Sequence, residues 1–117
     1  MQTDIITLAN IPQKDILPGC KMRAIHGESM TVTYWNLEKG AAIPEHSHPH
    51  EQIGSVIEGE IEVTLNGELR RLRKGDVLVF ASDSRHSVVA LENSYVIDVF
   101  HPVRDDYRQT GCLSIVL

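Results

Sequence analysis

The sequence predicts an all-β protein, built as a sandwich or barrel of short strands. Period-two alternation and β-branched residues recur along the chain, most plainly in residues 30–35, 61–65 and 77–80. No long segment shows the 3.6-residue period of an amphipathic helix. Many short strands separated by turn-forming residues are typical of sandwiches and barrels.

Turn-forming residues separate the expected strands in chain order. Asn66-Gly67 is the strongest hairpin signal, because both residues tolerate a positive φ. Further turns are expected at Pro18-Gly19, Lys39-Gly40 and Lys74-Gly75-Asp76. Near the carboxyl end, Asp105-Asp106-Tyr107 is expected to begin a short helical turn. The apolar residues 113–117 are expected to form a late strand or a strand exchanged with a partner.

Length and composition favour one domain over residues 1–117, with the functional motifs between about residues 40 and 104. The net charge of -5 comes without a basic stripe, which argues against nucleic-acid binding. No window is apolar enough for a membrane span, and the first ten residues lack the basic start of a secretion signal. Cys20 and Cys112 form neither a disulfide framework nor a zinc-ribbon pattern. We therefore expect a cytoplasmic protein.

Three of the six histidines lie at positions 46, 48 and 50, and Gln52 follows. In a continuous strand all four side chains would point to the same face. Neutral imidazole donates a lone pair to divalent metals, so this pattern predicts part of a metal site, with a further ligand from elsewhere in the chain. The alternative is a solvated loop, since Pro44, Pro49 and the neighbouring glutamates also suit a surface turn.

The spacing Gly40-x5-His46-Ser47-His48-x3-Gln52-x6-Gly59 resembles the first motif of the cupin family. The second cupin motif begins at a glycine and reaches a histidine about eleven positions later, as Gly75 and His86 do. This chain departs from that motif by carrying Ala81, Asp83 and Ala90 in place of its proline, glycine and asparagine, which leaves the turn geometry around His86 open.

The resemblance implies a single-domain cupin barrel, a double-stranded β-helix or jelly roll, that binds one divalent metal ion (Ni, Fe, Zn or Mn) through His46, His48, Gln52 and His86. Alone, His86 would be an ordinary loop histidine. Gln52 stands where many cupins carry glutamate, so the ligands do not compensate the charge of the ion and the centre favours an anionic ligand. We interpret His50 as a residue beside the ligands rather than a ligand.

Asp98 interrupts the otherwise apolar residues 95–100. A carboxylate in such a run carries a free-energy cost unless it is paired or used, so Asp98 is the candidate acid or base. The alternative is a solvated aspartate at a strand edge. Phe100 shares the face of Asp98 and is a candidate wall of the pocket. Arg104 is a candidate clamp for a substrate carboxylate, with an ion pair to Asp105 or Asp106 as the alternative.

Asp98-x-Phe100-x-x-x-Arg104, together with His-Ser-His-Pro-His-Glu-Gln, resembles the small pectin-degradation cupins, over about Gly40 to Tyr107. Those proteins linearise 4,5-unsaturated monouronates, released from pectin and alginate, to 5-keto-4-deoxyuronate. The resemblance implies catalytic roles for Asp98 and Arg104 and substrate binding by Phe100 and Arg104. It also implies a small anionic sugar as substrate and, with the apolar carboxyl end, a homodimer. The alternatives are a metal-dependent dioxygenase and a non-catalytic cupin that binds a sugar or anion.

Overall fold

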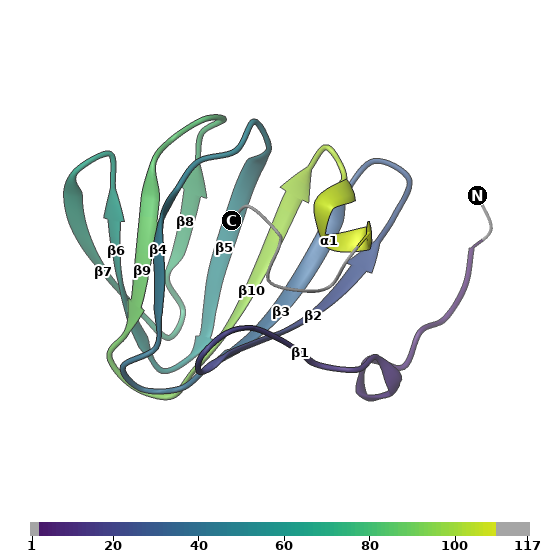
Figure 1. Ribbon diagram of the computed structural model, residues 1–117, viewed down its shortest axis with the longest axis horizontal. Coiled ribbons are helices and arrows are strands. Elements are labelled where there is room, and N and C mark those ends of the chain that lie inside the picture. Colours follow the sequence, from purple (N-terminus) through teal and green to yellow (C-terminus); the bar gives the residue numbers. More distant parts are fainter. Residues whose placement is uncertain (1–2, 110–117) are drawn as a thin grey trace.

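Two antiparallel β-sheets face each other in the computed structural model, which describes residues 3–109 (Figure 1). One sheet has six strands in the order β1-β2-β3-β10-β5-β8, and the other has four in the order β4-β9-β6-β7. This confirms the all-β prediction. The strands are β1 Lys14–Leu17, β2 Cys20–His26, β3 Thr31–Leu37, β4 Ala42–His46, β5 Glu51–Glu58, β6 Glu60–Leu65, β7 Glu68–Arg73, β8 Val77–Phe80, β9 His86–Ala90 and β10 Ser94–His101.

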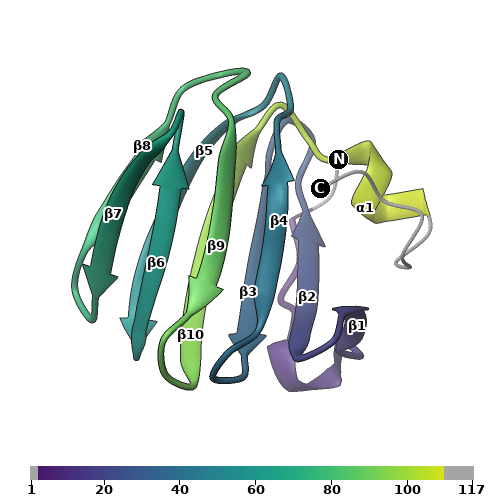
Figure 2. The ribbon, with the colours of Figure 1, turned by 60° about the vertical axis from the view of Figure 1, so that its left-hand side comes forward.

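The core lies between the two sheets, which Figure 2 shows stacked one behind the other. Along β3 and along most of β10, buried side chains alternate with more exposed ones, as expected for strands with one face on a core. Trp35, Val56, Val63 and Val96 are among the buried residues that fill the space. The period-two alternation in the sequence therefore marks the inner face of the sandwich.

The expected turns lie where the sequence places them. Asn66 and Gly67 connect β6 to β7 with φ angles of 48° and 85°, the left-handed pair that a tight hairpin requires. Gly19, Gly40 and Gly75 also have positive φ, each in the turn expected there. Glycine adopts this conformation without strain because it has no Cβ.

The predicted continuous strand through the histidine cluster is wrong. β4 ends at His46 and β5 begins at Glu51, so residues 47–50 form a loop that crosses from the four-stranded to the six-stranded sheet. Pro49 lies in this loop and cannot donate a backbone hydrogen bond to a strand neighbour. His48 therefore reaches the site from the crossing loop and not from a strand.

Helical structure within residues 3–109 is limited to a 3-10 turn, Leu8–Asn10, and the helix α1, Asp105–Gln109. The helix confirms the expected helical turn. No helix in this part of the chain has the length and apolar character needed to cross a bilayer. The strand expected over residues 113–117 lies outside the described residues.

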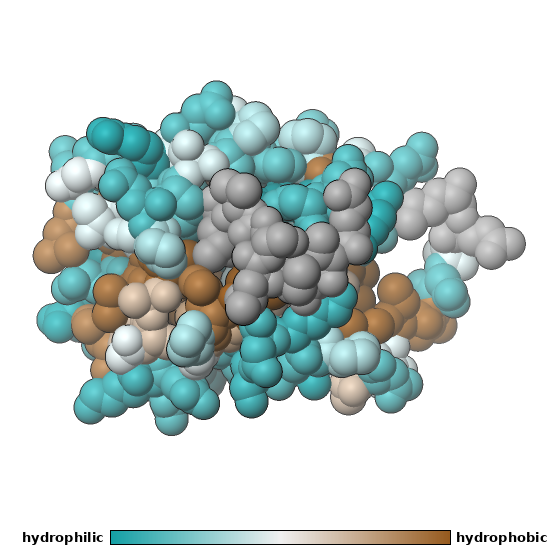
Figure 3. All heavy atoms as spheres, in the orientation of Figure 1, coloured by the Kyte–Doolittle hydropathy of each residue, from teal (hydrophilic) through white to brown (hydrophobic). Residues whose placement is uncertain are grey.

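An amino-terminal arm precedes β1 and extends away from the sandwich (Figure 1). Its side chains Ile5 and Ile6 are exposed, and Figure 3 shows hydrophobic surface at the end of the molecule where the arm lies. The guanidinium of Arg23, on β2, donates from Nε to the carbonyl oxygen of Ile11 at 2.6 Å. This hydrogen bond ties the base of the arm to the sheet.

Candidate metal centre and active-site cavity

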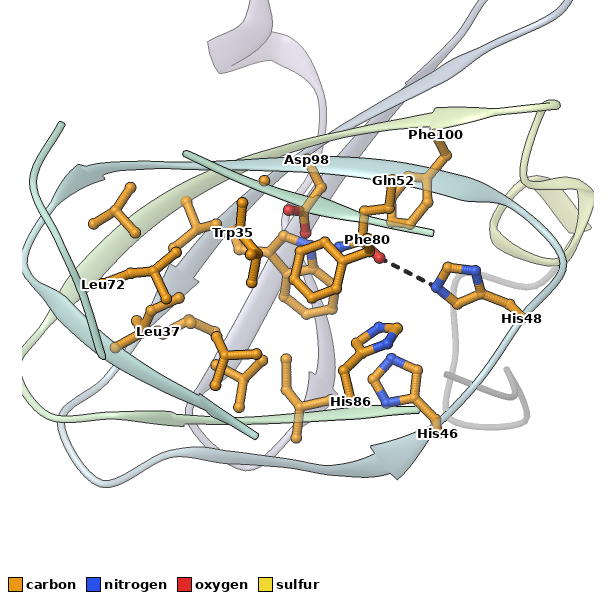
Figure 4. A pocket seen from close by; sticks show the side chains of 18 of the residues that line it. Trp35, Leu37, His46, His48, Gln52, Leu72, Phe80, His86, Asp98 and Phe100 are labelled. Atoms are coloured by element: carbon orange, nitrogen blue, oxygen red, sulfur yellow. Dashed lines mark hydrogen bonds between the residues drawn. The ribbon is translucent and has the colours of Figure 1, made fainter. Parts of the chain in front are cut away.

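A cavity between the sheets brings all seven predicted site residues together (Figure 4). Its polar end is lined by the predicted ligands and by the candidate acid, base and substrate-binding residues. The opposite end is apolar and includes Trp35, Leu37 and Leu72. The polar residues are His46, His48, Gln52, His86, Asp98 and Arg104, with Phe100 beside them.

The three histidines reach this point from different parts of the fold. His46, at the end of β4, is directly opposite His86, at the start of β9. Their ring centroids lie 4.2 Å apart, and the His48 ring lies 5.2 Å from His86. One imidazole nitrogen from each of the three lies within 4.8 Å of the others, close enough to share an ion. Two sheet positions and one loop thus build the cluster.

The turn between β8 and β9 holds the loop that carries His48. The backbone N–H of Asp83 donates to the carbonyl oxygen of His48 at 2.9 Å, and the Ser82 hydroxyl donates to that of Pro49. Asp83 has a φ of 64°, so it adopts the left-handed conformation at the position where the cupin motif carries glycine. Aspartate is one of the few other residues that tolerate this conformation, which explains how the chain departs from the motif and keeps its turn.

Backbone carbonyl groups fix the tautomer of all three rings. Nδ1 of His46 lies 2.8 Å from the carbonyl oxygen of Pro44, Nδ1 of His48 lies 3.1 Å from that of His50, and Nδ1 of His86 lies 3.0 Å from that of Ser84. A carbonyl oxygen only accepts, so each Nδ1 must be the donor. In a neutral ring Nε2 then carries the lone pair, which is the usual arrangement behind a metal-binding histidine.

Burial keeps these rings neutral at pH 7. Desolvation is the main cause that lowers the pKa of His48 and of His86 to about 4, and it lowers the pKa of His46 as well. Nε2 of His86 is buried and has no hydrogen-bond partner. A buried nitrogen lone pair without a partner is unfavourable unless a cation binds there. The donor set therefore fits a divalent metal ion.

Gln52 connects the histidines to Asp98. Its Oε1 lies 3.2 Å from Nε2 of His48, and its amide donates a hydrogen bond to the Asp98 carboxylate. Nε2 and Oε1 both carry lone pairs, which repel each other. Their contact is therefore favourable only when a cation lies near both atoms. This arrangement suits Gln52 as the fourth ligand, with its oxygen turned to the histidines and its nitrogen turned away.

Asp98 is buried in β10, between β3 and β5, so the alternative of a solvated edge aspartate is wrong. Burial is the largest cause that raises its pKa, to about 7, while the hydrogen bond from Gln52 and the charge of Arg104 oppose the rise. A carboxyl group with a pKa near the working pH can both take and give a proton. Asp98 therefore has the properties of a general acid or base.

Arg104 is 1% exposed and forms an ion pair with Asp106, one of the two intrachain partners that the sequence left open. Its Nε and Nη2 donate to the two carboxylate oxygens at 3.0 and 2.6 Å. The guanidinium carbon lies 4.7 Å from the centroid of the Phe100 ring and 3.9 Å from that of Tyr107. These contacts hold the cation at the cavity wall, and its role as a substrate clamp stays a prediction.

Tyr107 and Gly54 lie beside predicted site residues in the cavity and are not among the residues predicted from the sequence. Tyr107 is buried, lines the cavity and stacks on Arg104. Its position three residues after Arg104 in an expected helical turn was a usable signal, because such residues are neighbours on a helix. Gly54 also lines the cavity, directly opposite Asp98 in the pairing of β5 with β10. A lone glycine within a strand carried no signal of that contact.

Comparison with known proteins places this architecture in one family. The cupin domain family matches residues 33–100. A pectin degradation protein, KdgF of Dickeya dadantii strain 3937, is 34% identical over 99 residues, which cover 82% of this chain and 90% of that protein. The structure of KdgF from a Halomonas species superimposes with a TM-score of 0.84 at 36% identity, covering 90% of this chain and 98% of that one.

Two further solved structures extend the likeness. An RmlC-like cupin of Shewanella frigidimarina NCIMB 400 matches with a TM-score of 0.84 at 26% identity, covering 91% of this chain and 96% of that one. A variant of oxalate decarboxylase from Bacillus subtilis matches with a TM-score of 0.75 at 21% identity, covering 83% of this chain and 29% of that one. The second likeness shows the shared fold alone.

Replacing His48 or His86 with alanine should lower the metal content of the purified protein far more than replacing His50. His48 and His86 belong to the cluster of three, whereas His50 lies outside it. Elemental analysis by mass spectrometry measures the content, and His50→Ala is the matched control. Equal metal retention in all three variants would contradict the ligand assignment.

The metal-free protein should lose stability as the pH falls from about 6.5 to about 4. Histidines of the unfolded chain protonate near pH 6.5, whereas His48 and His86 resist protonation until about pH 4 in the fold. Each ring therefore lowers the free energy of unfolding by up to about 1.4 kcal/mol per pH unit as the pH falls. Asp98 acts in the opposite direction, because its raised pKa lets the folded chain keep one more proton.

Urea denaturation at several pH values measures this slope. His86→Asn should reduce the slope by the contribution of one proton, since the amide does not titrate. A slope identical to that of the wild-type protein would show that His86 does not resist protonation in the fold.

Proposed function

This chain belongs to the cupin family, and from that premise we propose that it is a metal-dependent enzyme that opens 4,5-unsaturated monouronates to linear 5-keto-4-deoxyuronate. The observation that carries the proposal is the shared cavity: a cluster of three neutral histidines and a buried carboxyl group with a pKa of about 7 line one pocket, and Gln52 contacts both. The histidine cluster would hold a cation and the carboxyl group would transfer a proton, and both would act on one small substrate.

The relatives support this substrate class. The Dickeya protein is named for pectin degradation, and pectin is a polymer of uronates, so its breakdown supplies anionic sugars. The cavity matches an anionic sugar. Its polar end offers a candidate cation site formed by neutral side chains, and the guanidinium of Arg104 adds a second positive charge. We place the reaction in the cytoplasm, which stays a prediction from the sequence.

His46, His48, His86 and Gln52 would hold the metal ion. When bound, the ion supplies a Lewis acid that stabilises negative charge on substrate oxygens. Three nitrogens and one oxygen suit zinc, iron, nickel or manganese, and the neutral donors leave the positive charge of the ion available to an anion. Arg104, fixed by Asp106 and Tyr107, adds a second cation for the carboxylate of the substrate, and the Phe100 ring packs beside it.

Asp98 would move the proton that the reaction relocates. In the net change, the C1 hydroxyl loses a proton, the bond between C1 and the ring oxygen breaks, and C4 gains a proton. C1 becomes an aldehyde and C5 a ketone, so no water is consumed and no electrons are exchanged. A carboxyl group that is half protonated near neutral pH can carry out both transfers.

Replacing Asp98 with asparagine should lower the turnover rate by ~10²–10⁴-fold, the usual contribution of a general acid or base. Asparagine keeps the shape and an acceptor oxygen for Gln52, so metal content and folding should stay close to wild type. The assay follows the decay of ultraviolet absorbance as the conjugated double bond of a freshly prepared unsaturated galacturonate is lost. The spontaneous rate is subtracted.

Three results would contradict this proposal. Metal-loaded wild-type protein that does not accelerate the decay excludes the uronate reaction, and Asp98→Asn that matches wild type assigns the proton transfer to another group. Consumption of oxygen that depends on the substrate would favour the dioxygenase alternative, which a centre of neutral histidines also supports.

We also propose that the chain forms a homodimer through the outer face of its six-stranded sheet. A row of β-branched apolar side chains crosses five neighbouring strands in direct register, from β8 to β2. Ile53, Val79 and Val99 of this row are 42%, 58% and 36% exposed, an unusual apolar face for a monomer. The row consists of Val79, Ile53, Val99, Val32 and Ile25.

The charges at the ends of another row of this sheet, the one through Asn36, favour a second copy as the partner. Lys21 on β2 and Glu58 on β5 occupy opposite ends of a register that also includes Asn36 and Tyr95. A two-fold axis parallel to the strands would place Lys21 of each copy opposite Glu58 of the other. Like apolar surfaces and opposite charges thus meet in one symmetric arrangement.

Replacing Val99 with lysine should convert the dimer to a monomer. The dimer would otherwise bury two lysine ammonium groups, one from each copy, near its two-fold axis. Light scattering coupled to size-exclusion chromatography measures the mass. Leu69→Lys is the control, since Leu69 is 61% exposed on β7 of the other sheet. A monomeric wild-type protein, or a dimer that survives Val99→Lys, would overturn the assignment of this face.

A further inference from the structure

Gly54 occupies the one position in β5 that lies directly opposite Asp98. A Cβ atom added to Gly54 would lie 2.6 Å from Oδ1 of Asp98, which is closer than nonbonded atoms approach. The backbone of Gly54 does not have a positive φ, so its conformation does not require glycine. The space that the missing side chain leaves is therefore filled by the carboxyl group of Asp98.

This carboxyl group in turn controls Gln52. The amide of Gln52 donates to Asp98, which turns Oε1 of the same amide toward His48, 3.2 Å from Nε2. An amide turned the other way would direct its N–H groups at the histidine cluster, where a cation cannot accept them. The position of the Asp98 carboxyl group thus decides which end of Gln52 faces the candidate ligands.

We propose that Gly54 is a positioning residue for both halves of the site: its missing side chain lets Asp98 lie against Gln52, and this contact directs Gln52 Oε1 to the metal ion. The inference rests on the proposed function, because it assigns the role of Gly54 within that metal centre. Gly54 acts through Asp98 and Gln52 and does not itself touch the substrate.

Gly54→Ala should weaken the binding of Zn²⁺ to the metal-free protein by ~10–100-fold, the usual effect of removing a residue that supports a metal ligand. Competition with a chromophoric chelator measures the affinity. Gly27→Ala is the matched control, because Gly27 also lacks a positive φ and its added Cβ would meet neighbours only at ordinary contact distances of 3.5 Å or more. The control should bind Zn²⁺ with wild-type affinity and open uronates at the wild-type rate.

A double-mutant cycle separates positioning from a general loss of structure. In an Asp98→Ala background the carboxyl group is gone, so Gly54→Ala should change the Zn²⁺ affinity by less than about twofold. The Phe80 ring, 3.3 Å from the added Cβ, is present in both backgrounds, so the difference between them isolates the carboxyl group. If Gly54→Ala alone does not fold, the double variant should still fold and bind as Asp98→Ala does.

Each outcome decides the proposal. Gly54→Ala that matches wild type in Zn²⁺ affinity would overturn it, and so would an equal loss in both backgrounds or a double variant that does not fold. A wild-type protein that binds no metal overturns both this inference and the proposed function, whereas one that binds metal and does not open uronates contradicts the proposed function alone. If the wild-type protein binds metal and opens uronates, and Gly54→Ala binds Zn²⁺ with the same affinity, only the role assigned to Gly54 is contradicted.

Discussion

The cavity depends on a single constraint: three imidazole rings, two buried and one half-buried, have their Nδ1 atoms bound to backbone carbonyl oxygens. Each of these hydrogen bonds sets the tautomer of its ring and leaves a lone pair on Nε2. Burial removes the water that would otherwise satisfy the lone pairs and lowers the pKa of the rings. A cation in place of the missing water would stabilise such a cluster, so binding of the proposed metal ion would be coupled to folding.

The second level of organisation extends from these rings to the opposite sheet. Gln52 spans the distance from His48 to Asp98, and Gly54 leaves the room that Asp98 occupies. The proposed proton-transfer group and a candidate metal ligand are thereby coupled through one amide. The same burial that lowers the pKa of the histidines raises the pKa of Asp98, because desolvation disfavours the charged form of either group. One apolar enclosure thus gives both groups the pKa values that their proposed roles near neutral pH require.

Asp106 and Tyr107 extend the site beyond the sheets. They belong to α1 and hold the guanidinium of Arg104 against Phe100, which lies at the end of β10. The backbone N–H of Arg104 donates to Thr31, on β3, at 2.8 Å. The cation is therefore fixed at both its backbone and its side chain, and the proposed recognition of a planar carboxylate requires such a fixed orientation.

The sequence alone determined the strand pattern, the turns and the identity of the residues at the polar end of the cavity. Alternation with period two reports which face of a strand is buried, and Asn66-Gly67 reports a backbone conformation, because both are local properties. The spacing of His46, His48 and Gln52 was recognised through its resemblance to the first cupin motif and not through the continuous strand that the alternation suggested. Only the tertiary structure decided that His48 lies in a loop, that Arg104 pairs with Asp106 and that Gly54 faces Asp98. These contacts depend on the register between strands and on the packing of α1, which bring distant residues together, and no local pattern records that geometry.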